Sequence, residues 1–297
     1  MRLISLFTDD KENIYAGLEC DNINYTILGY NAELEEAKVL NVHSKNKLSV
    51  VSFSLLKNGN PVVDGLWSPK TPKEAHGFFS IVVDKETFEQ TNKNFKPFTN
   101  QIFAKNRISE AAAAKGKGIK EVGVVKGVAD EKGNFFRVFE IYYSATTSNG
   151  NFRGYEENIF IVKYNELGEI QWQDILLRKN VYNNGEYYMS YKPLILNGEF
   201  IVLYNGHSLN LNVQEQKKCK NVLQGNFGYM TTFALKYNDD GKAKQEVFCE
   251  YKNRTFMYSP KNFRKFNDNL LFVEQNSRPA VRGRYIGKYG IYKIEEE

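Results

Sequence analysis

The sequence predicts an all-β, β-propeller-like fold of about five four-stranded antiparallel blades. Tight turns rich in Gly, Asn and Asp separate runs rich in Val, Ile, Phe and Tyr, a pattern typical of strands joined by hairpins. Copies of the same hairpin recur along the chain, which is the signature of a repeat architecture. Aromatic residues make up 14% of the sequence, with 19 Tyr and 21 Phe, and these residues favour strands.

The stretch from Gly127 to Leu177 is the clearest unit. Its two turns, Asp130–Asn134 and Asn165–Glu169, each lie between apolar runs. Four strands joined in this way form a small antiparallel sheet. This stretch therefore serves as the template against which the other units are aligned.

Both hairpins of the template recur. The first hairpin appears as FTDDKENIYAGLE (7–19), SLLKNGNPVVDGL (54–66), VADEKGNFFRVFE (128–140), PLILNGEFIVLYN (193–205) and RKFNDNLLFVEQ (264–275). The second appears as YTILGYNAELEEAKVL (25–40), FFSIVVDKETFEQ (78–90), IFIVKYNELGEIQW (159–172) and TFALKYNDDGKAKQEVF (232–248). A β-sandwich or a large barrel would also give many short strands, but neither predicts two turn motifs that alternate in register.

The chain is expected to form one domain in which the last unit has no fourth strand. Either the ring closes on a three-stranded blade, or the chain is the C-terminal part of a larger ring, and we favour the larger ring. SEAAAAK (109–115) predicts a short helix, because Ser109 can cap it and alanine has the highest helix propensity. The predicted units are 1–46, 47–103, 119–180, 187–255 and 256–297, with a loop insertion at 104–118.

The composition is that of a soluble globular protein, with 42% hydrophobic and 25% charged residues. The net charge of +5 is spread along the chain, so nucleic acid is not a favoured partner. No apolar run is long enough to span a membrane, and the opening MRLISLFTDDKENIYAG turns polar too soon for a signal peptide. The three cysteines, Cys20, Cys219 and Cys249, form no CxxC motif, which argues against a zinc site.

The stretch from Asp130 to the C-terminus resembles a family of uncharacterised, exported, propeller-like proteins of Bacteroidetes. The resemblance is carried by DEKGNFFRVFEIYYS (130–144), IFIVKYNELGEIQWQDIL (159–176), EYYMSYKPLILNGEFIVLYN (186–205) and YIGKYGIYKI (285–294). It implies a cell-envelope or periplasmic location and further blades before the part seen here. It implies no activity for any residue.

Loop length predicts where a ligand would bind. In a four-stranded blade the long connections share one face of the ring, and long loops on one side of a rigid scaffold are the usual place for binding. Those loops are expected at 66–77, 144–158, 206–228 and 275–284, joined by the insertion at 103–120. The candidate ligand-binding residues are Trp67, His76, Arg153, Tyr155, His207, Arg282 and Arg284.

The sequence contains no catalytic or metal-binding motif. His43, His76 and His207 lie far apart, and Asn238–Gly241 lacks the spaced acids of a calcium loop, which favours a hairpin turn. Propeller glycosidases use paired carboxylates, but nothing in the sequence pairs any of the strand and turn acids Asp9, Asp64, Asp84, Asp130 and Glu140. We therefore expect no metal, no cofactor and no catalytic residue.

The sequence favours a non-enzymatic binding or scaffold module of the cell envelope, which would engage a protein, a peptide or a glycan through the long-loop face. The alternative is a propeller enzyme, a hydrolase or a lyase, that acts on a glycan or a peptide. Two buried carboxyl groups about 5–10 Å apart in a channel would favour the enzyme, and a channel filled by apolar side chains would favour the binding module.

Overall fold

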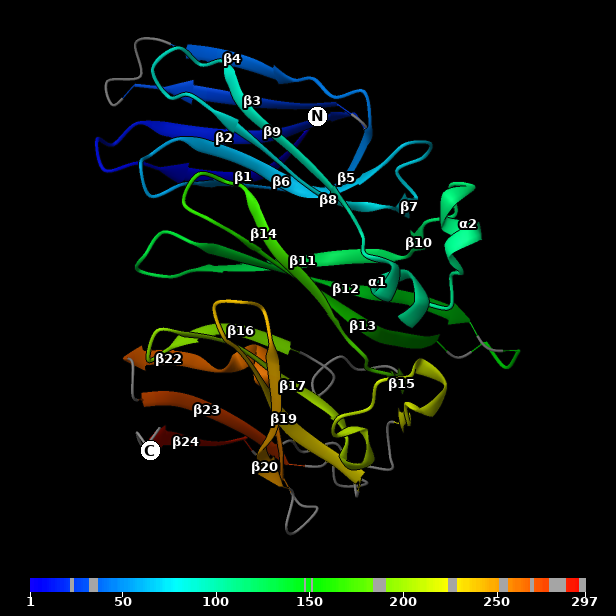
Figure 1. Cartoon of the computed structure of the whole chain (residues 1–297). Helices are drawn as coiled ribbons and strands as arrows, with labels where there is room; N and C mark the ends of the chain where they lie inside the picture. The colour runs from blue at the N-terminus through cyan, green and yellow to red at the C-terminus, as the bar shows by residue number, and fades with distance from the viewer. Residues whose placement is uncertain are drawn as a thin grey trace. The chain divides into compact units, whose positions relative to one another are not determined.

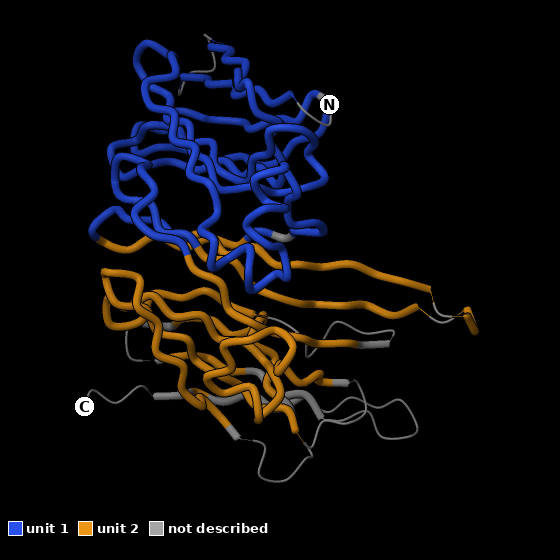
Figure 2. The backbone as a smooth tube through the Cα atoms, turned by 45° about the vertical axis from the view of Figure 1, so that its right-hand side comes forward, with its two compact units in different colours: residues 1–125, 132–136, 162–173 blue, residues 126–131, 137–161, 174–297 orange. Residues whose placement is uncertain are grey.

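Antiparallel β-sheets dominate the computed structural model (Figure 1). The structure describes the chain except for residues 22–23, 32–36, 147, 151, 184–190, 224–228, 251–255, 268–269, 278–286 and 294–297. The chain divides into two compact units (Figure 2). Unit 1 comprises residues 1–125, 132–136 and 162–173, and unit 2 comprises residues 126–131, 137–161 and 174–297.

Unit 1 contains two four-stranded sheets in which neighbouring strands pair antiparallel. The first has the order β1-β2-β3-β4, and the second has the order β5-β6-β8-β9. Their strands are β1 (Arg2–Thr8), β2 (Ile14–Asp21), β3 (Asn24–Tyr30), β4 (Ala37–Val42), β5 (Lys47–Leu55), β6 (Pro61–Ser68), β8 (Gly77–Val83) and β9 (Gln90–Pro97).

The core of unit 1 lies between these two sheets. Side chains from both sheets, including Ile27, Phe53, Val63 and Phe79, form one buried cluster. Each such side chain stabilises the fold by about 1.5–3 kcal/mol. Gly17 makes the close approach possible, because a Cβ atom at this position would lie 2.3 Å from the Phe53 ring.

The third sheet contributes residues to both units. Its strands are β11 (Val122–Ala129), β12 (Phe135–Thr146), β13 (Phe152–Tyr164), β14 (Ile170–Leu176), β15 (Asn180–Asn183) and β18 (Val222–Leu223). The two predicted hairpin turns connect its strands, with Gly133 and Gly168 at φ +91 and +77. The Asn165 carboxamide accepts hydrogen bonds from the Leu167 and Glu169 amides at 3.0 and 2.8 Å, which closes the second turn.

Unit 2 contains two further sheets. The first has the order β16-β17-β19-β20, with β16 (Tyr191–Leu196), β17 (Glu199–His207), β19 (Met230–Tyr237) and β20 (Ala243–Glu250). In the second, β23 (Leu270–Ser277) pairs with β24 (Gly287–Lys293), β21 (Phe256–Tyr258) and β22 (Arg264–Asn267). A buried cluster that includes Leu194, Leu203, Phe263 and Leu271 joins these two sheets.

The predicted helix is confirmed, and a second helix was missed. In α2 (Glu110–Ala114) the Ser109 hydroxyl accepts a hydrogen bond from the Ala112 amide at 3.3 Å. The second helix, α1 (Asn100–Lys105), is capped by Thr99 and buries Ile102 and Phe103. The predicted helix α2 thus lies within the insertion at 104–118, and most of α1, with its two buried side chains, lies just before that insertion.

The long loops are shorter than predicted. The expected loop at 144–158 is mostly strand, since β12 continues to Thr146 and β13 begins at Phe152. The loop at 66–77 holds β7 (Glu74–Ala75), which pairs with β10 (Ile119–Lys120). The segment at 206–228 contains the 3-10 helices η1 (Ser208–Asn210) and η2 (Gln216–Lys218). Most of the loop at 275–284 lies outside the described residues.

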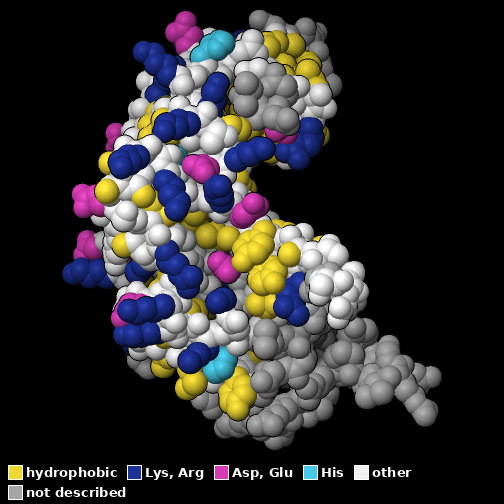
Figure 3. Space-filling model, turned by 90° about the vertical axis from the view of Figure 1, so that its right-hand side faces the viewer, with side chains coloured by type: hydrophobic (Ala, Val, Ile, Leu, Met, Phe, Trp, Pro, Cys, Tyr) yellow, Lys and Arg dark blue, Asp and Glu magenta, His cyan; other side chains and the backbone are white. Residues whose placement is uncertain are grey.

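Charged side chains are distributed over the face drawn in Figure 3, where Lys and Arg are interspersed with Asp and Glu. Among the described residues, no helix has the length and apolar character that crossing a membrane requires. The turn at Asn238 is a hairpin turn, as predicted, because the Asn238 carboxamide accepts a hydrogen bond from the Lys242 amide at 2.8 Å.

Candidate functional site: a basic groove in unit 2

The structure distributes the predicted ligand-binding residues over both units. Trp67 and His76 belong to unit 1, and Arg153, Tyr155 and His207 belong to unit 2. Arg282 and Arg284 lie outside the described residues. The surroundings of the five described residues are taken unit by unit below.

Trp67 and His76 lie together, with ring centroids 6.4 Å apart. His76 is only 7% exposed and meets the edge of Phe103 from α1 at 6.3 Å. Burial lowers the pKa of His76, partly opposed by the nearby Glu74 carboxylate. This arrangement is that of a packed core histidine under a helix, with little surface left for a ligand.

Tyr155 and His207 each stack on another aromatic ring of unit 2. Tyr155 stacks on Tyr143 with centroids 4.7 Å apart, and His207 stacks on Tyr229 at 5.2 Å. Arg153 stands on the same strand as Tyr155, where β13 pairs with β15. Arg153, Tyr155 and His207 are each half-buried.

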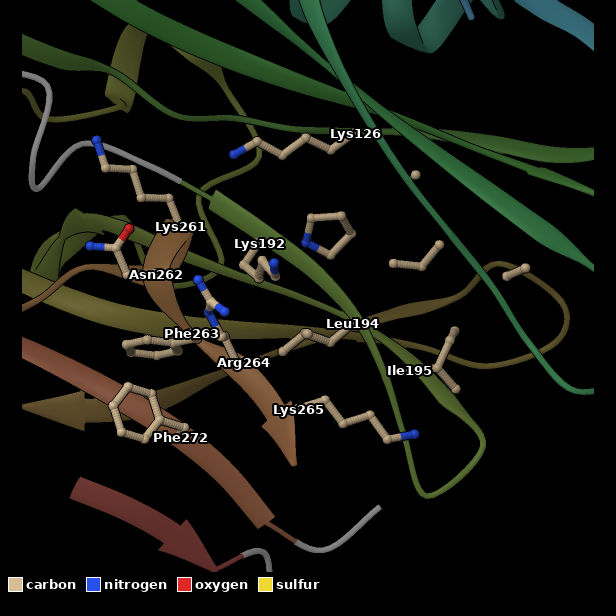
Figure 4. A pocket seen from close by; sticks show the side chains of 14 residues that line it. Lys126, Lys192, Leu194, Ile195, Lys261, Asn262, Phe263, Arg264, Lys265 and Phe272 are labelled. Atoms are coloured by element: carbon tan, nitrogen blue, oxygen red, sulfur yellow. The ribbon is translucent and has the colours of Figure 1, made fainter. Parts of the chain in front are cut away.

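A cavity lies elsewhere in unit 2, at strands that the sequence analysis assigned to the scaffold and not to the binding face. It is an open groove of about 1410 Å³. Its walls come from β11, from β16, and from η4 (Pro260–Asn262) with β22, plus Phe272 of β23 (Figure 4). It is lined by Lys126, Gly127, Val128, Ala129, Lys192, Pro193, Leu194, Ile195, Lys261, Asn262, Phe263, Arg264, Lys265 and Phe272.

The charge of this basic groove is one-sided. Five of its lining residues are cations, namely Lys126, Lys192, Lys261, Arg264 and Lys265, and none of the fourteen lining residues is Asp or Glu. Cations brought together in a concave surface raise the local concentration of anions. The apolar part of the wall comes from Leu194, Ile195, Phe263 and Phe272.

Lys126 is held in this groove by Tyr191. Its Nζ atom donates a hydrogen bond to the Tyr191 carbonyl oxygen at 2.8 Å and lies 4.1 Å from the centre of the Tyr191 ring. Burial lowers the pKa of Lys126 to about 8, and the nearby cations Arg178, Lys192 and Lys261 add to the effect against the opposing Glu156. A substantial fraction of Lys126 is therefore a neutral amine near pH 8.

A buried ion triad lies behind Tyr191. Arg178 is fully buried and pairs through Nη2 with Glu140, and with Glu156 at 3.4 Å. The Arg178 guanidinium lies 6.0 Å from the centre of the Tyr191 ring, and the Tyr191 hydroxyl donates to the Val138 carbonyl at 3.1 Å. Tyr191 thus lies between the triad and Lys126, and its carbonyl oxygen accepts the hydrogen bond from Lys126.

Two carboxyl groups are thus brought together, although no sequence motif indicated it, but they are not accessible to a substrate. Glu140 and Glu156 are 5% and 6% exposed, and both point at one guanidinium nitrogen. A glycosidase needs one carboxyl group beside the leaving oxygen and another at the sugar ring. Within the described part of the chain, no group of three or more His, Cys, Asp or Glu side chains could hold a metal ion.

Sequence reasoning missed the groove because it searched loops. Lys126, Lys192 and Lys265 stand in β11, β16 and β22, within the runs GVVKGVA, SYKPLIL and FRKFN. A lysine inside an apolar strand, as at Lys126 and Lys192, was the available signal.

Comparison with known proteins gives similarity in structure alone. No protein-family model and no curated protein matches the chain. The chain is similar to an endo-arabinase from Bacteroides thetaiotaomicron VPI-5482, with 12% identity and a TM-score of 0.31 over 98% of this chain and 93% of that one. It is also similar to an α-L-arabinofuranosidase from Lactobacillus brevis, with 9% identity and a TM-score of 0.36 over 96% of this chain and 88% of that one. A B. megaterium levansucrase variant has 8% identity and a TM-score of 0.33 over 98% of this chain and 80% of that one.

These similar structures are enzymes. This comparison contradicts the expectation of a non-enzymatic binding or scaffold module and agrees better with the alternative of a propeller enzyme. TM-scores of 0.31 to 0.36 transfer no residue's role to this chain. The resemblance to uncharacterised exported proteins stays a prediction.

Proposed function

We propose that the protein is an enzyme that acts on an anionic glycan, and that it binds this glycan in the basic groove of unit 2. The observation that carries the proposal is a groove of about 1410 Å³ with five cations and no acid in its lining. Pockets for small molecules measure about 300–1,000 Å³. A larger, open groove suits a segment of a polymer, and its charge requires that polymer to be acidic.

The chemistry of the wall favours a glycan over a peptide. A peptide brings backbone N–H and C=O groups that need partners once they leave water, and Asn262 is the only neutral amide side chain in the lining. A uronate chain instead offers one carboxylate per ring and apolar C–H faces between them. The cations of the groove match the carboxylates, and Phe263, Phe272, Leu194 and Ile195 match the C–H faces.

The proposal extends to the scaffold. We propose that the four-stranded sheets are blades of a propeller of about five blades, possibly one part of a larger ring, as the repeats predict. The arrangement within unit 2 supports this, because β11 and β16, the first strands of two successive sheets, line the groove together with β22 of the next sheet. The innermost strands of a propeller line its central channel.

Affinity measurements with the intact chain test the proposal. Calorimetry should show that a polyuronate binds, that a neutral glycan of similar length does not, and that binding weakens as salt is raised. Replacing Lys192→Gln together with Lys265→Gln should weaken binding tenfold or more, since each lost charge-assisted hydrogen bond contributes about 1.5–3 kcal/mol.

A matched control comes from the exposed cations Lys217 and Lys218, which pair with Glu215 outside the groove. The variant Lys217→Gln with Lys218→Gln removes the same charge and should bind normally. Equal loss in both double variants would show nonspecific attraction and overturn the proposal. Stronger binding of single-stranded DNA or of an acidic peptide than of any polyuronate would also overturn it.

A further inference from the structure

We propose that Lys126 is the general base of a lyase reaction, which removes a proton from a uronate ring of the bound glycan. This inference rests on the proposed function and deepens it by naming the reaction and its central residue. It starts from the position of Lys126, whose amine faces a groove rich in cations while its Nζ atom is anchored on the Tyr191 carbonyl at 2.8 Å.

The surroundings of Lys126 fit a base. An amine can accept a proton only when it is neutral, and burial beside other cations favours the neutral form. The charged and titratable groups around it are Arg178, Glu156, Lys192, Lys261 and Tyr191. Arg178 is held by Glu140 and Glu156, so the positive charge nearest to Lys126 on the buried side is fixed in place.

The other candidates for the base are excluded by their geometry. The Tyr191 hydroxyl donates to the Val138 carbonyl at 3.1 Å, and burial raises the pKa of Tyr191, so the phenol stays protonated. Glu140 and Glu156 are buried on Arg178. Among the fourteen residues that line the groove there is no carboxylate and no histidine.

The composition of the described lining also favours one reaction. A hydrolase of the usual kind needs a carboxyl acid and a second carboxylate at the sugar ring, and none of the fourteen described residues that line the groove supplies either. An elimination needs a base and cations that neutralise the uronate carboxylate, because the proton on the adjacent carbon becomes acidic only as that charge is stabilised. Lys192, Lys261 and Arg264 are placed to do so.

The step balances without a further reactant. The Nζ lone pair of Lys126 takes the proton from C5 of the uronate, and the electron pair of the C5–H bond forms the C4=C5 double bond. The C4–O4 bond breaks and its electron pair leaves on O4, which water from the open groove protonates. Nothing is oxidised or reduced, and Lys126 returns its proton to solvent.

Two variants of Lys126 test the step with the intact chain and a polyuronate. Lys126→Met removes the amine, and Lys126→Arg keeps a positive charge on a group that does not act as a base near neutral pH. Both should lose about 100-fold or more of the turnover, the usual contribution of a general base, measured as the ultraviolet absorbance of the unsaturated product. Lys126→Arg should bind the polyuronate within about threefold of the wild type.

The outcomes separate the two proposals. Wild-type turnover that survives in either variant overturns Lys126 as the base. Wild-type cleavage that yields new reducing ends without the absorbance identifies a hydrolase, which overturns the lyase reaction and leaves the proposed function standing. If the wild type neither binds nor cleaves any polyuronate, both proposals fall. Lys217→Gln with Lys218→Gln is the control that should keep full turnover, and thermal unfolding confirms that each variant is folded.

Discussion

The two units each place a nitrogen base beside an aromatic ring, but His76 of unit 1 is buried whereas Lys126 of unit 2 lines a groove. In unit 1, His76 lies against Trp67 and Phe103 and is 7% exposed beneath α1. In unit 2, Lys126 lies over Tyr191 at the edge of a groove of about 1410 Å³. Burial lowers the pKa of both groups. The two bases differ in how accessible they are to a ligand, and this accessibility cannot be read from the sequence.

The comparison also separates two uses of buried charge. His76 is enclosed by apolar and aromatic groups, whereas Lys126 is backed by the ion triad of Arg178, Glu140 and Glu156. A buried ion triad is seldom the most stable solution, since apolar residues of similar volume often do as well. We infer that its role is to fix Tyr191 and the charge near Lys126.

Removing the centre of the triad should have the largest effect on stability. Arg178→Met removes the guanidinium that pairs with two buried carboxylates, and we expect a loss of about 3–5 kcal/mol in the free energy of unfolding, measured by chemical denaturation. Adding Glu140→Gln and Glu156→Gln should recover much of that loss. If Arg178→Met alone were as stable as the wild type, the triad would not support Tyr191.

The histidine should matter to stability alone. His76→Ala leaves a cavity beneath α1 and should cost about 1–3 kcal/mol, visible as earlier unfolding and a change in the emission of the adjacent Trp67. Binding of a polyuronate should be unchanged. A loss of that binding in a folded His76→Ala protein would make His76 part of a ligand site and end the contrast between the two regions.

The two bases should affect stability in different ranges of pH. A lowered folded-state pKa means that the unfolded chain binds more protons, so stability rises with pH between the folded and unfolded pKa values. For Lys126 this range runs from about 8 to 10.5, and for His76 it lies below 6.5. Denaturation at several pH values measures this dependence. The rise in stability between pH 8 and 10.5 should be lost in Lys126→Met, and the rise below pH 6.5 should be lost in His76→Ala. If the rise in stability persisted in the corresponding variant, another group would be responsible for that proton uptake.

The smallest effect concerns the caps of the two short helices. Removing a capping hydroxyl costs about 0.5–2 kcal/mol. Thr99→Ala should lie higher in this range than Ser109→Ala, because α1 buries Ile102 and Phe103 and α2 buries none of its residues. Urea denaturation of the two variants measures the difference. The reverse order would show that α1 contributes little to the enclosure of His76.

Sequence reasoning went furthest where the signal was local. The turns at Gly133 and Gly168 and the helix capped by Ser109 follow from short-range rules, and the structure contains all three. The helix α1 was missed because it is one and a half turns long and its two buried side chains are fixed by tertiary contacts. The strand extension to Thr146 was missed because polar residues can continue a hairpin beyond the core.

The site was harder to predict, because it is assembled from distant strands. Lys126, Lys192 and Lys261 meet around one groove although more than sixty positions separate each from the next. Glu140, Glu156 and Arg178 are likewise brought together by β12, β13 and the segment after β14. The net charge of the whole chain is only +5. This value gives no sign that five cations are gathered in one groove.

The central claim is that Lys126 is an accessible base in an anion-binding groove, and its own reactivity tests this most directly. Competitive labelling of the intact chain with acetic anhydride, followed by peptide mass spectrometry, gives the pKa of the Lys126 amine and its accessibility. We expect a pKa of about 8 and strong protection of Lys126 by a polyuronate, with no protection of Lys217. A pKa near the ordinary lysine value of 10.5, or equal labelling of Lys126 with and without the polyuronate, would contradict the account.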